Sequence, residues 1–331
     1  MVEKNNLKNI PPKSDFLKDD IYLHHKNKHL KQNSFIGFSI KEIDKKVNNK
    51  QILKTNNIGL RCEDLNTIKR TNTILLGGSV AFSSFASCEE QTISSLLQKN
   101  SNKKIINCGV GGHVFKQHLS LYFNYLKNIE TKNIIILFGF NDLVNCYLGR
   151  KYDEILNPDF STKVQNSYLS PVSTSIKILA IEFLDKIRIR NIIHDLLLKR
   201  NQNKVYKEIN EDLIKDYINE IIKDTIFFNK YCQKFNINLI LALQPSIYTS
   251  QKELSNYENN NFNTYLTKYP NRQKFIKTFN NLLNDRLSFF KNYHNLDNIF
   301  QETNDTLFFD EVHLNDKGNF IISNFFIELL D

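Results

Sequence analysis

The sequence predicts an α/β fold with a doubly wound, parallel sheet of about five strands in the order 2-1-3-4-5. Apolar runs rich in β-branched residues recur between turn residues, as buried strands do. Segments with helical spacing of apolar residues lie between these runs, and strands that alternate with helices are typical of parallel sheets. A chain of 331 residues with 41% hydrophobic content is long enough to bury such a core.

The predicted strands are four short runs, at residues 73–76, 104–107, 133–138 and 237–243. The helical patterns between them include residues 88–100 (CEEQTISSLLQKN) and 116–128 (KQHLSLYFNYLKN). In this architecture ligands bind beyond the carboxyl ends of the strands. The first strand ends in GGS (77–79), the second in NCGVGGH (107–113) and the third in GFND (139–142). We therefore expect these three segments to meet at one edge of the sheet.

The chain is predicted to form an N-terminal arm, partly extended, over residues 1–54 and a single domain over residues 55–331. The arm includes the basic tract HHKNKH (24–29), which we interpret as a solvated segment rather than a metal site. Residues 150–236 hold long helical patterns at 176–198 and 209–231, and we predict a helical insertion there that covers the sheet and part of the cleft. The alternative for residues 176–198, where Lys and Arg intersperse the apolar positions, is contact with a membrane surface.

The composition limits the kinds of partner and the compartment to be expected for this protein. The net charge is +9, but the basic residues are spread out, and without an aromatic-basic motif nucleic-acid binding is not expected. The five cysteines lack CxxC or His-Cys spacing, so we interpret them as free thiols in a reducing compartment and expect no metal. The sequence shows neither a signal-peptide core nor an apolar stretch of about 18 residues, so the expected compartment is the cytoplasm. The oligomeric state stays open.

Two of only 10 glycines directly precede Ser79 in TILLGGSVAFSS (73–84). Such a turn either packs tightly and does nothing more, or lifts the serine hydroxyl into a cleft as a nucleophile. A nucleophilic serine needs a base, a group that orients the base, and donors for the oxyanion. Asp310 and His313 lie three positions apart in FFDEVHLNDKGNF (308–320). The carboxylate can accept one imidazole proton and leave the other nitrogen free for the serine.

Candidate oxyanion donors follow the next two strands. Gly112 lets the backbone approach a substrate and offer its N–H. The side-chain amide of Asn141 and the backbone N–H of Ser79 can donate to the same oxygen. Each fragment alone is common in proteins, but their joint occurrence at successive strand ends, followed by DxxH, is far less so. This chemistry requires no metal or organic cofactor.

Other residues near these segments have competing interpretations. His113 is a rival base, and its other expected role is to line the cleft, where Phe140 is a second candidate substrate contact. Asp142 is expected to fix the loop of Asn141. Arg61 is assigned either to an anionic ligand or to a structural salt bridge.

In four segments, in order, the sequence resembles the SGNH or GDSL-like hydrolases: GGSV, GVGGH, GFND and DEVHLNDKGN. Residues 55–62 (TNNIGLRC) and 241–248 (LALQPSIY) extend the resemblance. It implies a three-layer α/β/α, flavodoxin-like fold and a serine esterase or acyl-transfer mechanism with Ser79, His313 and Asp310 as the triad. Gly78 replaces the Asp of the family's namesake motif, and we interpret this change as a subgroup feature.

The resemblance favours an O-acetyl ester on a carbohydrate or surface polysaccharide as the substrate. The bulky residues around Ser79 also favour a short acyl group. The alternatives are an O-acyltransferase with the same triad, a lipase-like enzyme or thioesterase, and a catalytically silent binding module.

Overall fold

The computed structural model describes residues 30–156 and 210–330. At its centre is a five-stranded parallel sheet with the spatial order β6-β5-β7-β8-β9. Its strands are β5 (Thr73–Gly77), β6 (Ile105–Gly109), β7 (Asn133–Phe138), β8 (Asn238–Leu243) and β9 (Tyr293–Asn295). Counted along the chain, this order is 2-1-3-4-5, so the predicted fold class is confirmed.

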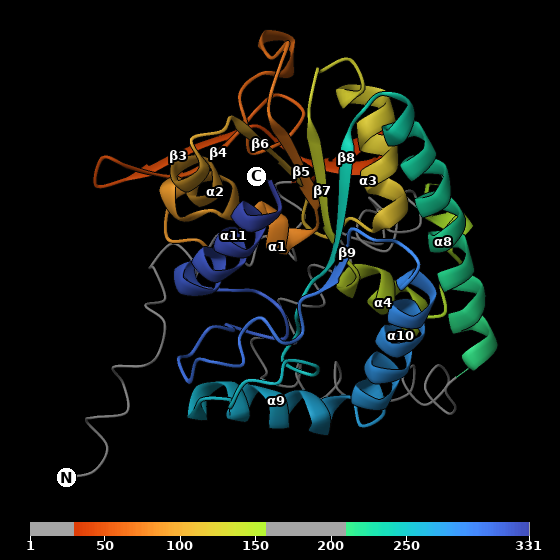
Figure 1. Cartoon of the computed structure of the whole chain (residues 1–331). Helices are drawn as coiled ribbons and strands as arrows, with labels where there is room; N and C mark the ends of the chain where they lie inside the picture. Colours follow the sequence, from red (N-terminus) through yellow and green to blue (C-terminus); the bar gives the residue numbers. More distant parts are fainter. Residues whose placement is uncertain (1–29, 157–209, 331) are drawn as a thin grey trace, which may run out of the picture.

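Helices cover both faces of the sheet, which makes three layers (Figure 1). One face packs against α2 (Ile93–Ser101) and α11 (Asp316–Leu330). The other packs against α3 (Phe115–Leu121), α8 (Glu211–Lys234) and α10 (Arg272–Leu287). Alternate residues of β7 divide between the layers, since Ile134 and Ile136 join one core and Ile135 and Leu137 the other. A strand buried on both faces is apolar throughout, which explains the continuous run NIIILF.

The remaining helices gather at the carboxyl edge of the sheet. The single-turn helix α1 (Ser79–Phe82) begins directly after β5, and α4 (Phe140–Tyr147) begins directly after β7. Helix α9 (Asn256–Lys268) lies beyond the same edge, at the bottom of Figure 1. The strand ends and these helices together frame the region where the sequence places its candidate residues.

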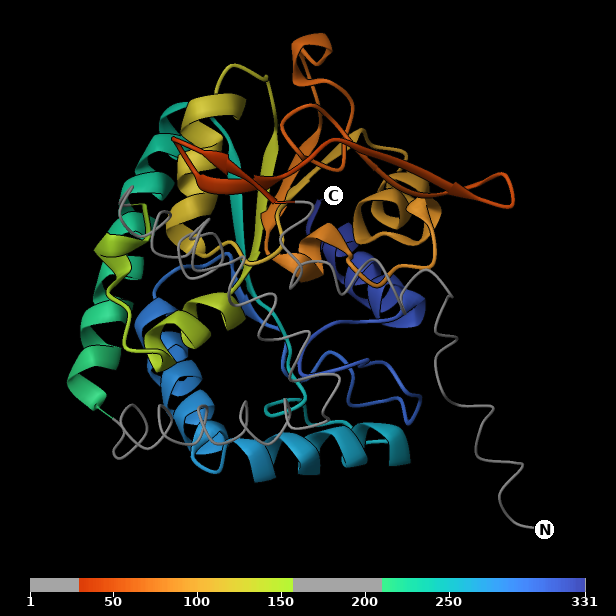
Figure 2. The ribbon, with the colours of Figure 1, turned by 180° about the vertical axis from the view of Figure 1, so that it is seen from behind.

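Residues 30–55, most of which belong to the predicted arm, form two antiparallel hairpins. The first joins β1 (Leu30–Asn33) to β2 (Gly37–Ile40), and the second joins β3 (Ile43–Val47) to β4 (Lys50–Thr55). Figure 2 shows them lying across the molecule beside α3 and α2. Ile36, Ile40 and Ile52 are buried in the same core cluster as α3. The hairpins are therefore packed parts of the domain, and the tract HHKNKH lies outside the described residues.

The predicted insertion is described only in part. The pattern at 209–231 corresponds to α8, whose Ile214, Ile218 and Ile221 are buried against the sheet. The pattern at 176–198 lies outside the described residues. In the two described ranges, no helix combines the length and apolar character needed to cross a bilayer.

Candidate active site

Neighbouring atoms approach both glycines before Ser79 closely. A Cβ on Gly77 would lie 2.3 Å from the carbonyl oxygen of Leu137 on β7. A Cβ on Gly78 would lie 2.5 Å from the side-chain nitrogen of Asn141. The carbonyl oxygen belongs to the backbone of β7 and cannot move aside, so position 77 needs glycine. The Asn141 nitrogen is the end of a side chain, so a Cβ at position 78 would push the amide away from its place beside the serine turn.

Ser79, His313 and Asp310 form a continuous chain of hydrogen bonds. The Ser79 Oγ lies 2.7 Å from the His313 Nε2, and the His313 Nδ1 lies 2.7 Å from the Asp310 Oδ2. Because a carboxylate can only accept, the imidazole carries its proton on Nδ1 and turns the Nε2 lone pair toward the serine hydroxyl. This is the arrangement in which an imidazole can remove the serine proton.

The Asp310 carboxylate is held in its charged form. Burial alone would raise the pKa of Asp310, but the neighbouring His313 and several hydrogen bonds outweigh burial and lower it. The Oδ1 atom accepts the backbone N–H groups of Val312 and His313, at 3.0 and 2.9 Å. The loop itself is closed by the backbone N–H of Phe309, which donates to the His313 carbonyl. Asp310 is thus an ionised, fixed partner for the imidazole.

Asn141 lies at the first turn of α4 with its amide beside the serine turn. Its Nδ2 donates one hydrogen to the backbone carbonyl of His113, at 2.9 Å. The amide has a second hydrogen, for which the described part of the chain shows no acceptor. Gly112 precedes His113 in the loop that follows β6. The loops after β6 and β7 therefore meet next to Ser79, as the parallel sheet requires.

The His113 side chain does not reach the triad. Its ring is only 1% exposed, and its Nε2 donates to the carbonyl of Phe38 on β2 at 2.8 Å. Burial lowers the pKa of His113 to about 4, so the ring is neutral. The ring contacts Phe38 and His118, with centroids 5.0 and 6.1 Å away. Its backbone carbonyl, rather than its side chain, is the part that touches the site.

Phe140 and Asp142 flank Asn141 on α4. Phe140 is half-buried and lies under the guanidinium of Arg272, 5.8 Å from the ring centre. Asp142 is fully buried and accepts the backbone N–H of Phe115 with both oxygens, at 3.0 and 3.2 Å. Burial raises the pKa of Asp142 to about 7. Asp142 ties the start of α4 to the start of α3, and so fixes the turn that carries Asn141.

Arg61 lies inside the structure, where each of its three side-chain nitrogens makes a hydrogen bond. Its Nε is 2.9 Å from Glu89, and its terminal nitrogens donate to the carbonyls of Phe82, Ser83 and Ile52. Arg61 is only 7% exposed. Its hydrogen bonds therefore fit a structural salt bridge, one of the two roles that the sequence suggested, and not the binding of an anionic ligand. Arg61 thereby anchors the end of α1, the helix that begins with Ser79.

A buried ion pair that sequence inspection missed supports the segment leading to Asp310. Lys252 and Glu258 are 0% exposed at their side chains, and their Nζ and Oε2 atoms are 2.6 Å apart. The other carboxylate oxygen of Glu258 accepts the backbone N–H groups of Leu307 and Phe308, each at 2.9 Å. The sequence could have indicated a role for Glu258, because Ser255 and Glu258 have the spacing of a capping box. They form that box at the start of α9.

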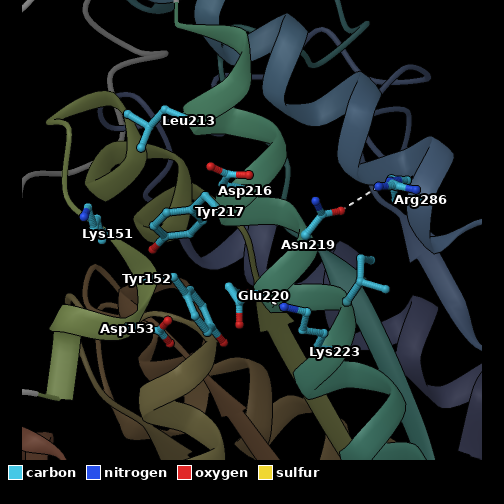
Figure 3. A pocket seen from close by; sticks show the side chains of 11 residues that line it. Lys151, Tyr152, Asp153, Leu213, Asp216, Tyr217, Asn219, Glu220, Lys223 and Arg286 are labelled. Atoms are coloured by element: carbon cyan, nitrogen blue, oxygen red, sulfur yellow. Dashed lines mark hydrogen bonds and ion pairs between the residues drawn. The ribbon is translucent and has the colours of Figure 1, made fainter.

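A separate cavity of about 530 Å³ lies between α8 and the 3-10 turn η7 (Tyr152–Leu156) (Figure 3). Its walls mix cations such as Lys151 with carboxylates such as Glu220, and Arg286 donates to Asn219 at one end. No candidate residue of the sequence analysis lines it. Among the described residues, no cluster of three or more His, Cys, Asp or Glu is suited to hold a metal ion.

No protein-family model matches the sequence of this chain, and no curated protein matches it either. The chain is similar to several solved structures. An acetyl xylan esterase shares 13% identity over 78% of this chain and 100% of its own, with a TM-score of 0.44. An acetylxylan esterase from Geobacillus stearothermophilus shares 11% over 78% and 94%, with a TM-score of 0.44. A GDSL-like lipase from Bacteroides thetaiotaomicron shares 11% over 79% and 87%, with a TM-score of 0.40.

Proposed function

We propose that this protein is a serine hydrolase that cleaves a short acyl ester, with an O-acetyl group on a carbohydrate as its substrate class. The observation that carries the proposal is the chain of two 2.7 Å contacts from Ser79 through His313 to Asp310. The three residues come from the end of β5 and the loop before α11. A hydrogen-bonded nucleophile, base and acid from two distant segments is the arrangement that identifies a candidate catalytic triad.

In the proposed reaction, the Ser79 Oγ attacks the ester carbonyl carbon while the His313 Nε2 takes the hydroxyl proton. Asp310 stabilises the resulting imidazolium. The tetrahedral oxyanion accepts hydrogen bonds from the backbone N–H groups of Ser79 and Gly112 and from the free hydrogen of Asn141. One such donor typically contributes about 3 kcal/mol to the lowering of the barrier.

The intermediate then collapses to an acyl-enzyme. His313 returns its proton to the leaving alcohol oxygen as the C–O bond breaks. In the second half of the cycle His313 takes a proton from water, the hydroxide attacks the acyl carbon, and the proton returns to the Ser79 Oγ as the acid leaves. Each step uses these side chains, the backbone N–H donors of Ser79 and Gly112, and water.

The preference for a short acyl group is supported by aromatic rings near the nucleophile. Phe85 lies against His313 and also contacts Phe309, and both phenylalanines are 8% exposed. Phe140 adds a third ring directly before Asn141. Bulky groups close to the serine leave little room for a long acyl chain in the transition state.

The test is release of p-nitrophenol from acetyl, butyryl and octanoyl esters by the wild type and by Ser79→Ala. Ser120→Ala is the matched control, since Ser120 lies on α3 and its hydroxyl donates to the Phe35 carbonyl. We expect turnover by the wild type and the control, none by Ser79→Ala, and the highest kcat/KM for the acetyl ester. Undiminished turnover by Ser79→Ala would overturn the proposal.

The same experiment separates the alternatives. Activity that rises from acetyl to octanoyl would overturn the short-acyl assignment and favour a lipase-like enzyme. One equivalent of p-nitrophenol without further turnover would favour an acyltransferase that awaits an acceptor alcohol. Lack of any reaction in all variants would favour a binding module.

A further inference from the structure

Phe85 stacks on the imidazole of His313. The ring centroids are 4.7 Å apart and the ring planes are inclined by only 25°. Phe309 lies 5.1 Å from Phe85, and both rings are almost fully buried. This aromatic cluster is separate from the two main cores. It lies where the serine turn and the histidine loop meet.

The backbone on each side of Phe85 is fixed. Helix α1 stops at Ser83, whose positive φ of 56° reverses the chain, and Arg61 donates to the Ser83 carbonyl. On the other side, the backbone N–H of Ser87 donates to Asp316 at 2.8 Å. Asp316 is the first residue of α11 and follows His313 by three positions. The bond from Ser87 to Asp316 therefore ties the segment of Phe85 directly to the segment of His313.

The hydrogen bonds of His313 lie at its two ring nitrogens, and the ring is also held at Cγ by its own side chain. The remaining soft motion is a tilt out of the ring plane, which weakens both hydrogen bonds. A flat ring packed against its face opposes this tilt. An aromatic face also attracts a cation, so the same contact favours the imidazolium that forms during the reaction.

We propose that Phe85 is a positioning residue that sets the plane of the His313 ring and stabilises its charged form. This inference rests on the proposed function, because the imidazolium forms only if His313 acts as the base. Because the ring of Phe85 packs on the imidazole, we expect its removal to affect the chemical step when the acyl group is as small as acetyl.

The test compares Phe85→Leu and Phe85→Tyr with the wild type, using p-nitrophenyl acetate. Leucine keeps an apolar side chain but has no aromatic face, whereas tyrosine keeps the ring. We expect Phe85→Leu to lower kcat about tenfold with KM within about twofold, and Phe85→Tyr to restore kcat to within about threefold. The rate at which a phosphonate ester labels Ser79 should fall in parallel, because labelling needs the same base.

The matched control is Phe326→Leu, since Phe326 is a fully buried phenylalanine of α11 that packs in the core between this helix and the sheet. It loses comparable packing away from His313 and should keep kcat within about twofold. Phe85→Met replaces Phe85→Leu if the latter does not fold. A loss of kcat equal in the leucine and tyrosine variants, or a change confined to KM, would refute the positioning role. Ser79-dependent turnover with a fully active Phe85→Leu would refute this inference alone, whereas absent turnover in the wild type would refute both proposals.

Discussion

Glu258 offers a sharp test of how the histidine loop is held. Replacing it with alanine removes the partner of Lys252 and leaves a charged ammonium group in a place with no access to water. It also removes the acceptor used by the backbone N–H groups of Ser255, Leu307 and Phe308. The expected result is a large loss of stability, concentrated at the segment that leads to Asp310.

The size of the stability loss can be worked out from the burial of the Lys252–Glu258 ion pair. Breaking a buried ion pair by removing one partner typically costs about 3–5 kcal/mol, because the remaining charge is uncompensated. Unsatisfied backbone donors cost about 1–3 kcal/mol each, although the exposed end of the segment can relax toward water. We therefore expect Glu258→Ala to lower the free energy of unfolding by about 4 kcal/mol or more. That is a large part of the stability of an ordinary domain, which is about 5–15 kcal/mol.

The assay is urea unfolding of Glu258→Ala, Lys252→Met and the variant that combines Lys252→Met with Glu258→Gln. The double variant removes both charges, so it should be more stable than Glu258→Ala by about 2 kcal/mol or more. Glu130→Ala is the exposed control, since Glu130 pairs with Arg70 at the surface, and its removal should cost less than about 1 kcal/mol. A cost of Glu258→Ala no greater than that of Glu130→Ala, or a double variant no more stable than Glu258→Ala, would refute the expected role of the buried ion pair.

Three further outcomes are expected. Asn141→Ala should reduce kcat about 100- to 1000-fold in ester hydrolysis assays while the midpoint of thermal unfolding changes little, because a transition-state donor is lost. Gly78→Ala should reduce kcat by a similar factor, since its Cβ would displace the Asn141 amide; an active Gly78→Ala would contradict the placement of Asn141. Asp142 has a pKa raised by burial to about 7, so its contribution to stability is full below about pH 4 and is lost as the pH rises through 7. Urea unfolding at pH 5 and pH 8 should show this loss in the wild type and a flatter profile in Asp142→Asn.

Local sequence patterns predicted the parallel sheet well. The strand at 133–138 was predicted with its observed bounds, and the other three differ by one or two residues at their ends. Buried strands are continuous apolar runs, and such runs are visible without any tertiary information. Strand β9 was not identified because it has only three residues and its last, Asn295, is exposed. Its pairing with β8 is decided by the sheet rather than by its own composition.

The hairpins at residues 30–55 were not predicted, although the sequence holds a residue pair that favours a hairpin turn. Asn48 and Asn49 both have positive φ, of 48° and 62°, as a two-residue hairpin turn requires, and asparagine tolerates this conformation. The strands β3 and β4 are rich in lysine, so their composition gives little sign of burial. The burial of Ile36 and Ile52 depends on α3 and the sheet, which local composition does not report.

For the candidate site, the residue types and spacing indicated which side chains come together, but not what supports them. The DxxH spacing suffices to place Asp310 beside His313, because both lie in one short loop. The stacking of Phe85 on His313 joins residues more than two hundred positions apart and follows from the tertiary fold. His113 shows the reverse case, since its place beside Gly112 suggested a cleft residue, whereas the hairpin strand β2 covers its ring.

The contact between Ser79 and His313 spans 234 positions of the chain, and this separation has a consequence for how activity is acquired. Closing a loop of that length costs on the order of 5 kcal/mol of chain entropy, which local contacts at the two ends cannot offset. The hydroxyl and the imidazole therefore meet only when the sheet between them has assembled. Under the proposed mechanism, a ribosome-bound chain that has exposed the serine but not yet the histidine has no base for the serine, so only molecules that have completed folding turn over substrate.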